Sequence, residues 1–320
     1  MYMFKYIMKR LALLVMTFLI IIIICFVLIK SLKIDVSVPF GQDRDIIMAQ
    51  LEDRGYFDPI PIQFVTYIKR IFMYGDFGVC YNLPEYRNRL VLDIFKDKLP
   101  PTILINVYST VISVPIGIGL GIFAALKKNK WQDQVISTTV MLFISVPSFI
   151  YAFLVQYLFC FLLGWFPLFM KAGYDYFTWD MFNSMLPAVI SLSFGSVAGY
   201  ARSTRAELTE VLTSDFMLLA RTKGLTKAQA TTRHALRNAM VPIFPSIVGE
   251  FVNVLGGSLI IEKIFSVPGV GGLYLMSINS QDYDSFMFLS GFYILVGLLA
   301  SIVIDLSYGV IDPRIRMGAK

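Results

Sequence analysis

The sequence is poor in the residues from which enzymes most often build catalytic or metal sites. It contains one histidine, His234, and three cysteines, Cys25, Cys80 and Cys160. The spacing of the cysteines matches no zinc-site pattern and supports no disulfide framework. The chain also lacks the G-x-x-x-x-G-K-[ST] motif that cradles nucleotide phosphates, so we expect no ATPase site of its own. We therefore expect no catalytic residue, metal or cofactor.

Charged residues are also scarce. They make up 16% of the 320 residues, whereas hydrophobic residues make up 57% and the mean hydropathy is +0.68. Soluble domains are about a quarter charged, and a soluble fold cannot hide this much apolar side chain from water. The composition predicts one all-α, polytopic membrane protein.

Six segments are apolar and long enough to cross a bilayer core, which takes about 20 residues as a helix. They are approximately residues 11–30, 102–126, 135–163, 184–201, 241–262 and 286–311. The first follows Lys5, Lys9 and Arg10 and has no small-residue cleavage site after it. We interpret it as an uncleaved span rather than a signal peptide. The fourth is the weakest of the six, because it is rich in serine and glycine.

Basic residues are distributed unevenly between these spans. They gather in the N-terminus and in three other segments, which are 127–134, 202–240 and the C-terminal tail. The short segments 164–183 and 263–285 contain only Lys171 and Lys263 as basic residues. This asymmetry is typical of positive-inside orientation and predicts cytoplasmic N- and C-termini. Because it accounts for the net charge of +6, we do not expect nucleic-acid binding.

Three regions follow from this arrangement. Residues 1–30 form a cytoplasmic N-terminus and the first span, 31–101 an extracytoplasmic region, and 102–320 the core of the membrane domain. Within the second region, the spacing of apolar residues predicts short helices over 43–54 and 61–74.

The predicted cytoplasmic segment 202–240 has helical composition and no proline. Thr213 or Ser214 can cap a helix that begins at Asp215, and Gly224 suits the position that follows its end. A second helix then follows. The sequence predicts a short helical pair at the inner membrane face, and a plain connecting loop is the alternative.

Glycines recur in and between the spans. Gly117 and Gly121 are four residues apart, as are Gly195 and Gly199, and small residues at this spacing let helices approach closely in lipid. We expect packing within the chain, and an interface with a partner remains open for the fourth span. The run from Gly269 to Gly272 predicts a turn or hairpin.

Ionisable groups within spans are costly and usually face protein or a watery path. Glu250, with Asn253 one turn further, lies near the middle of the fifth span. We expect this face to line a translocation path, and a structural bond to a neighbouring helix is the alternative.

Several strings resemble the permease subunits of ABC importers, most of all the peptide and nickel branch. In the coupling loop these are Ala220-Arg221-Thr222-Lys223-Gly224-Leu225 and Arg233-His234-Ala235-Leu236-Arg237-Asn238-Ala239. Similar pieces elsewhere, in the family's order, are Gly75-Asp76-Phe77-Gly78, the stretch 258–265, Pro268-Gly269-Val270-Gly271 and Ile311-Asp312-Pro313-Arg314. Leu218 stands where the coupling loop has its leading glutamate. The resemblance runs along the whole chain, and the pattern is most similar to the first oligopeptide permease subunit.

The resemblance implies the type I permease fold of ABC importers, in the bacterial cell membrane. It implies a second permease subunit, two cytoplasmic ATPase subunits, an extracytoplasmic peptide-binding protein and oligopeptides as cargo. The ATPase-coupling residues would be Asp215, Ala220, Arg221, Lys223, Gly224, His234 and Arg237. Pro268, Gly269 and Gly271 would form an outer gate. Dipeptides or nickel chelates remain open as cargo.

Two other functions are weaker alternatives. An intramembrane enzyme would need catalytic groups at one depth, but the lone His234 lies outside the predicted spans. An ion-coupled transporter that works alone should show internal repeats, and the two halves of the chain show no convincing repeat.

Overall fold

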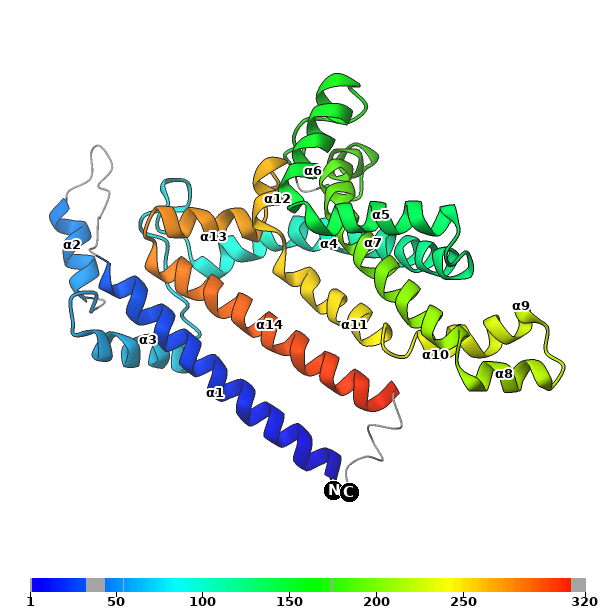
Figure 1. Cartoon of the computed structure of the whole chain (residues 1–320). Helices are drawn as coiled ribbons and strands as arrows, with labels where there is room; N and C mark the ends of the chain where they lie inside the picture. The colour runs from blue at the N-terminus through cyan, green and yellow to red at the C-terminus, as the bar shows by residue number, and fades with distance from the viewer. Residues whose placement is uncertain (1, 33–43, 54, 174, 312–320) are drawn as a thin grey trace. The chain divides into compact units, whose positions relative to one another are not determined.

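Helices make up the ordered elements of the chain. The computed structural model describes residues 2–32, 44–53, 55–173 and 175–311. Over these residues it contains helices and one isolated antiparallel bridge, between Val79 and Leu90, but no strand (Figure 1). The predicted all-α fold is confirmed. The chain divides into two compact units, Met1–Pro100 with Val270–Leu298 and Pro101–Gly269 with Leu299–Lys320.

The first unit joins the N-terminal helix to short helices that follow it. Its elements are α1 (Tyr2–Ser31), α2 (Arg44–Asp53), α3 (Ile60–Tyr74), η1 (Pro84–Tyr86), α13 (Val270–Asn279) and the first parts of α4 (Val91–Leu126) and α14 (Tyr283–Ile311). α2 and α3 confirm the two helices predicted over 43–54 and 61–74. α3 ends at Gly75, which takes the left-handed conformation (φ 60°) that terminates many helices.

The segment after α3 is fixed to the start of α14 by carboxylates. Asp282 accepts hydrogen bonds from the backbone amides of Tyr81 (2.7 Å) and Asn82 (2.8 Å), and it caps α14 through the amide of Ser285 (3.1 Å). Cys80 lies beside it with no exposed surface. Burial, followed by the charge of Asp282, raises the pKa of the Cys80 thiol to about 12. Cys80 is therefore a protonated core thiol at neutral pH.

The second unit holds most of the membrane helices. Its elements are the remainders of α4 and α14 with α5 (Trp131–Ser145), α6 (Ser148–Val155), η2 (Gln156–Leu162), α7 (Trp179–Leu212), α8 (Asp215–Thr222), α9 (Lys227–Ala230), η3 (Thr231–Ala235), α10 (Leu236–Ala239), α11 (Phe244–Asn253), η4 (Val254–Gly256) and α12 (Leu259–Ile264).

Glycines of α4 allow it to cross α7 closely. A Cβ atom at Gly117 would lie 2.7 Å from the Cβ of Tyr200, and one at Gly121 would lie 2.6 Å from the Cβ of Thr204. Packing within the chain is therefore confirmed for this pair. A Cβ at Gly199, in contrast, would meet nothing within 4 Å. Of the second pair, only Gly195 lies at a close contact, since a Cβ there would be 3.2 Å from the Tyr151 hydroxyl.

Four helices of the described chain could cross a membrane by length and composition, or six if two bent pairs each count as one span. The four are Met8–Ser31, Val91–Leu126, Trp179–Leu212 and Tyr283–Gly309. The weak fourth prediction, 184–201, is thus part of a helix of 34 residues. The predicted count of about six lies within this range of four to six.

Two predicted spans differ from the structure. The third, 135–163, is broken by 104° between α5 and α6. Pro147 explains the break, because the residue before a proline is forced out of the helical region, and Val146 is extended (ψ 128°). The fifth, predicted as 241–262, ends as a helix at Gly256, and its bent partner is Lys227–Ala239. Gly257 ends it with φ 61° and ψ −173°, a conformation essentially restricted to glycine.

The predicted helical pair within 202–240 is present, with one correction. α8 begins at Asp215, and Gly224 follows its end with φ 90°. The side chains of Thr213 and Ser214 do not cap α8, however. They donate instead to carbonyls of the last turn of α7, Thr213 to Glu210 (2.9 Å) and Ser214 to Val211 (2.6 Å). Ser214 is the N-cap residue by position alone.

Candidate functional site

A hairpin of helices projects from the end of α7 and forms the first part of the candidate site. It consists of two helices, α8 and the continuous helix Lys227–Ala239, which lie side by side (Figure 1). Thr226 caps the second helix in a capping box with Gln229, since each side chain bonds to the other residue's backbone amide. We call residues 213–239 the helical hairpin. The start of its second helix is thus defined by local side-chain chemistry.

Alanines attach the helical hairpin to the membrane helices. Its buried core residues pack with Leu208 of α7 and Ala125 of α4, and they are Met217, Ala220, Ala230, Ala235 and Ala239. Small side chains let the helices approach closely, so the hairpin rests on the ends of two long helices. A force on the hairpin would therefore be transmitted to α4 and α7 rather than absorbed by a flexible loop.

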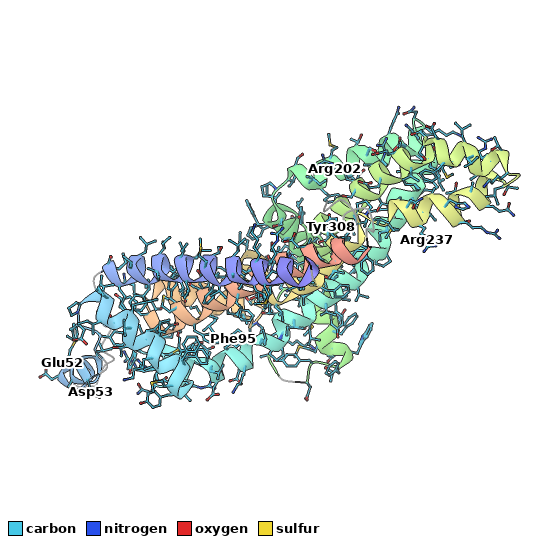
Figure 2. The ribbon with its side chains drawn as sticks, turned by 90° about the horizontal axis from the view of Figure 1, so that it is seen from below. Glu52, Asp53, Phe95, Arg202, Arg237 and Tyr308 are labelled. Atoms are coloured by element: carbon cyan, nitrogen blue, oxygen red, sulfur yellow. The ribbon has the colours of Figure 1, made fainter. Side chains whose placement is uncertain are left out.

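The predicted coupling residues divide into two groups. Ala220 is buried and Gly224 forms the turn, so these two shape the hairpin. The charged and titratable members are exposed, and they are Asp215, Arg221, Lys223, His234 and Arg237. Arg237 lies on α10 (Figure 2). This division gives the hairpin a packed inner side and a charged outer surface.

The second part of the candidate site is a polar cavity of about 380 Å³ in the second unit. Glu250 of α11 and Glu207 of α7 line it, together with five hydroxyl side chains, Ser196, Tyr200, Ser203, Ser246 and Tyr308. Tyr308 lies near the end of α14 (Figure 2). Within the described part of the chain, no lysine or arginine lines this cavity. Its chemistry suits a cation or a group that donates hydrogen bonds.

Glu250 bonds to a neighbouring helix and also lines the polar cavity. Its Oε1 accepts a hydrogen bond of 2.8 Å from Ser196 of α7, which is the bond to a neighbouring helix. It also faces the cavity. Asn253 is exposed at the end of the same helix but is not among the lining residues. Sequence reasoning did not single out Glu207, because α7 was expected to leave the membrane near residue 201.

The third part is the turn that follows α12. Glu262 is fully buried and accepts a hydrogen bond of 2.9 Å from Thr102 Oγ1. Gly257 and Gly269 pack against this carboxylate, and a Cβ atom at either would collide with Glu262 and Thr102. Pro268 and Gly269 of the predicted gate lie in this turn, whereas Gly271 is buried in α13 of the first unit. Glu262 lies within the stretch 258–265 that carries part of the family resemblance, but the sequence assigned it no role of its own.

Comparison with known proteins then places the chain. Residues 117–317, which include the helical hairpin and the polar cavity, match the family described as "Binding-protein-dependent transport system inner membrane component". The chain belongs to this family. The resemblance drawn from the coupling-loop strings is thereby confirmed.

Curated relatives of this transport-component family match along nearly the full chain. The dipeptide transport system permease protein DppB of Bacillus subtilis is 33% identical over 99% of this chain and 99% of its own. The oligopeptide transport system permease protein OppB of Escherichia coli is 31% identical over 98% of this chain and 100% of its own. The glutathione transport system permease protein GsiC of Salmonella typhi is 31% identical over 98% and 99%.

Solved structures support the same fold. An amino acid ABC transporter crystallised with histidines aligns with a TM-score of 0.50 at 20% identity, over 68% of this chain and 94% of its own. The MetNI methionine ABC transporter aligns with a TM-score of 0.50 at 14% identity, over 68% and 97%. At these identities the likeness concerns the fold alone. It agrees with the predicted ABC-importer permease fold.

Proposed function

We propose that the chain is one of two channel-forming permease subunits of an ATP-driven importer of oligopeptides. The helical hairpin carries this proposal, because a packed helical pair with a charged outer surface suits the task of receiving motion from a separate ATPase. The relatives named for dipeptides, oligopeptides and glutathione support a peptide cargo. Dipeptides or nickel chelates are the alternative cargo for the same machinery.

The proposed complex contains a second permease subunit, two cytoplasmic ATPase subunits and an extracytoplasmic peptide-binding protein. Both termini and the helical hairpin would lie in the cytoplasm, and residues 31–101 outside the bacterial cell membrane. The exposed side chains of Asp215, Arg221, Lys223, His234 and Arg237 would contact an ATPase subunit. Individual rim ion pairs contribute only about 0–1 kcal/mol, so the fit of the hairpin as a whole would provide most of the docking energy.

Glu250 and Asn253 would lie along the translocation path, which the cavity at Glu250 supports. The carboxylates and hydroxyls that line this cavity could bind the charged N-terminus of a peptide. Pro268, Gly269 and Gly271 would form the outer gate. The dense packing of Gly257 and Gly269 on Glu262 supports a gate turn that keeps its shape.

Charge reversal on the helical hairpin tests the proposal. Asp215→Arg combined with Arg237→Glu should abolish co-purification of the ATPase subunits and peptide-stimulated ATP hydrolysis, because like charges at a docking surface cost several kcal/mol. Both side chains are exposed, so the melting temperature should not change. Arg202→Glu, on the exposed surface of α7 outside the hairpin, is the matched control.

Peptide uptake by the same reconstituted complex tests the proposed place of Glu250 on the translocation path. Glu250→Gln should reduce the uptake of peptides with a free N-terminus about tenfold and leave N-acetylated peptides unchanged, because it removes a charge-assisted hydrogen bond. Glu210→Gln, at an exposed position of α7 outside the cavity, is the control. Peptide uptake by vesicles that contain this chain without any ATPase subunit would refute the proposed function.

A further inference from the structure

A second cavity, of about 460 Å³, lies where the helical hairpin meets the ends of α4 and α7. Four basic residues from three segments line it: Lys128 and Lys130 from the turn between α4 and α5, Arg221 from α8, and Lys227 from α9. Among the residues that the structure describes, no aspartate or glutamate lines it. We call it the basic cavity. The role proposed for the hairpin in receiving motion from an ATPase uses Arg221, but it does not account for the three lysines of this cavity.

The basic residues of this cavity lack the partners that other basic residues of the chain have. Arg205 is paired with Asp133 and Arg70 with Asp76, each with an N–O distance of 2.8 Å. Among the described residues, none of the four that line the basic cavity forms an ion pair. Four like charges around one space repel one another, and an anion inside it would relieve that repulsion.

A buried hydroxyl gives an independent sign of a missing ligand. Thr231 lines the basic cavity and is only 6% exposed, yet its Oγ1 has no hydrogen-bond partner within the described chain. The hydroxyl of Ser214, which lines the same cavity, donates to the Val211 carbonyl at 2.6 Å. An unsatisfied buried hydroxyl costs free energy. A ligand with acceptor oxygens would satisfy it.

The cavity also has an apolar side, formed by residues at the ends of two long helices. α4 ends at Leu126 and α7 at Leu212, and both residues line the cavity. Leu218 lines it as well, and its side chain is 61% exposed. A ligand that fills the cavity therefore meets cations, a hydroxyl donor and leucines. That combination describes an amphiphile with an anionic head.

We propose that the basic cavity binds the phosphate group of an anionic phospholipid, with the acyl chains along Leu126 and Leu218. Basic pockets between membrane helices are suited to such headgroups, and each nearby lysine or arginine strengthens the attraction. The bound phosphate links the turn at Lys128 and Lys130 to α8 and α9, so the lipid stiffens the base of the helical hairpin. This proposal goes beyond the proposed function and is independent of the cargo.

Native mass spectrometry of the transporter complex, released from nanodiscs of mixed phosphatidylglycerol and phosphatidylcholine, tests the proposal. The wild-type complex should retain phosphatidylglycerol in preference to phosphatidylcholine. The variant Lys128→Gln/Lys130→Gln/Lys227→Gln should lose about a hundredfold of that preference, because three favourable charges are removed. The control Lys127→Gln/Arg202→Gln/Arg233→Gln removes as many positive charges outside the lining and should keep the preference.

A conservative variant probes the hydroxyl. Thr231→Val keeps the side-chain shape and should reduce the preference about tenfold without loss of stability, because it removes only an unsatisfied donor. Equal retention of the two lipids by the wild type, or equal retention by the lysine variant and its control, overturns the proposal.

Two other occupants give distinct results. Retention of inorganic phosphate by the lipid-free complex in detergent, lost in the lysine variant, would assign the cavity to a free anion and overturn the lipid. Loss of the ATPase subunits from the lysine variant in pure phosphatidylcholine would assign the basic residues to protein docking and also overturn it.

Discussion

At the scale of single residues, a fully buried carboxylate organises the turn around α12. Glu262 bonds Thr102, which lies 160 residues away in the chain, and two glycines close over it. A buried carboxylate is tolerated only when its hydrogen bonds are satisfied. The close approach of Gly257 and Gly269 is thus part of how this site is closed to water.

Adjacent glycines permit a matched test of that closure. Gly257→Ala should destabilise the protein by about 3 kcal/mol, because φ is 61° there and the new Cβ would lie 2.6 Å from Glu262 Oε1. Gly256→Ala should leave stability unchanged or slightly raised, since a Cβ there meets nothing within 4 Å. Thermal melting of the purified complex in detergent gives the comparison. Equal melting temperatures for the two variants would show that the turn relaxes freely.

Candidate site residues could be recognised from the sequence when their residue type was unusual for the surrounding segment. Glu250 stood out because it is an acid inside an apolar span, and Gly224 because it interrupts a helical pattern. Glu262 and Asp282 gave no such signal, because each lies at the end of an apolar segment where an acid is ordinary. Their importance comes from partners such as Thr102 and Tyr81, which are about 160 and 200 residues away. A single sequence does not contain that pairing.

At the scale of elements, the existence and type of the helices were predictable, whereas their ends were less so. Apolar length marked α1, α4 and α14, because about 20 such residues suffice for a span. α7 continues past the predicted end at residue 201 to Leu212. Its added turns carry charged residues that the hydropathy pattern assigns to a loop. One of these, Arg205, is held by a carboxylate on α5.

The Arg205–Asp133 pair locks α5 onto α7 and offers a second test. Asp133 is buried and accepts from Arg205 Nη2 (2.8 Å) and from the backbone amide of Asn129 (2.9 Å). Asp133→Ala should destabilise the protein by about 3 kcal/mol, because it leaves Arg205 without its partner. Asp97→Ala breaks the exposed pair with Arg89 and should cost at most about 1 kcal/mol.

Melting temperatures of the two variants and of Asp133→Ala/Arg205→Ala check this expectation. Loss of both partners should cost less than loss of Asp133 alone, since no unpaired guanidinium remains. A smaller fall in melting temperature for Asp133→Ala than for Asp97→Ala would show that the Arg205–Asp133 pair does not stabilise the packing of α5 on α7.

At the scale of the whole molecule, one long helix separates two segments of opposite character. Before α7 lies the segment 164–178, with one lysine, and after it lies the helical hairpin, with many basic residues. The positive-inside rule assigns the basic side to the cytoplasm, and every proposed partner depends on that assignment. The charge pattern predicts orientation, whereas the fold alone is compatible with either direction.

Cysteine accessibility measures the orientation directly. Phe177 is 89% exposed before α7, and Arg233 is exposed in the hairpin after it. In a Cys25→Ser background, Phe177→Cys should react with a membrane-impermeant maleimide in intact cells, whereas Arg233→Cys should react only after the membrane is opened. Cys80 should stay silent in both states, because it has no exposed surface and its pKa is about 12. The reverse order of labelling would place the hairpin outside the cell, out of reach of a cytoplasmic ATPase. Labelling of both positions from one side would mean that α7 does not cross the membrane.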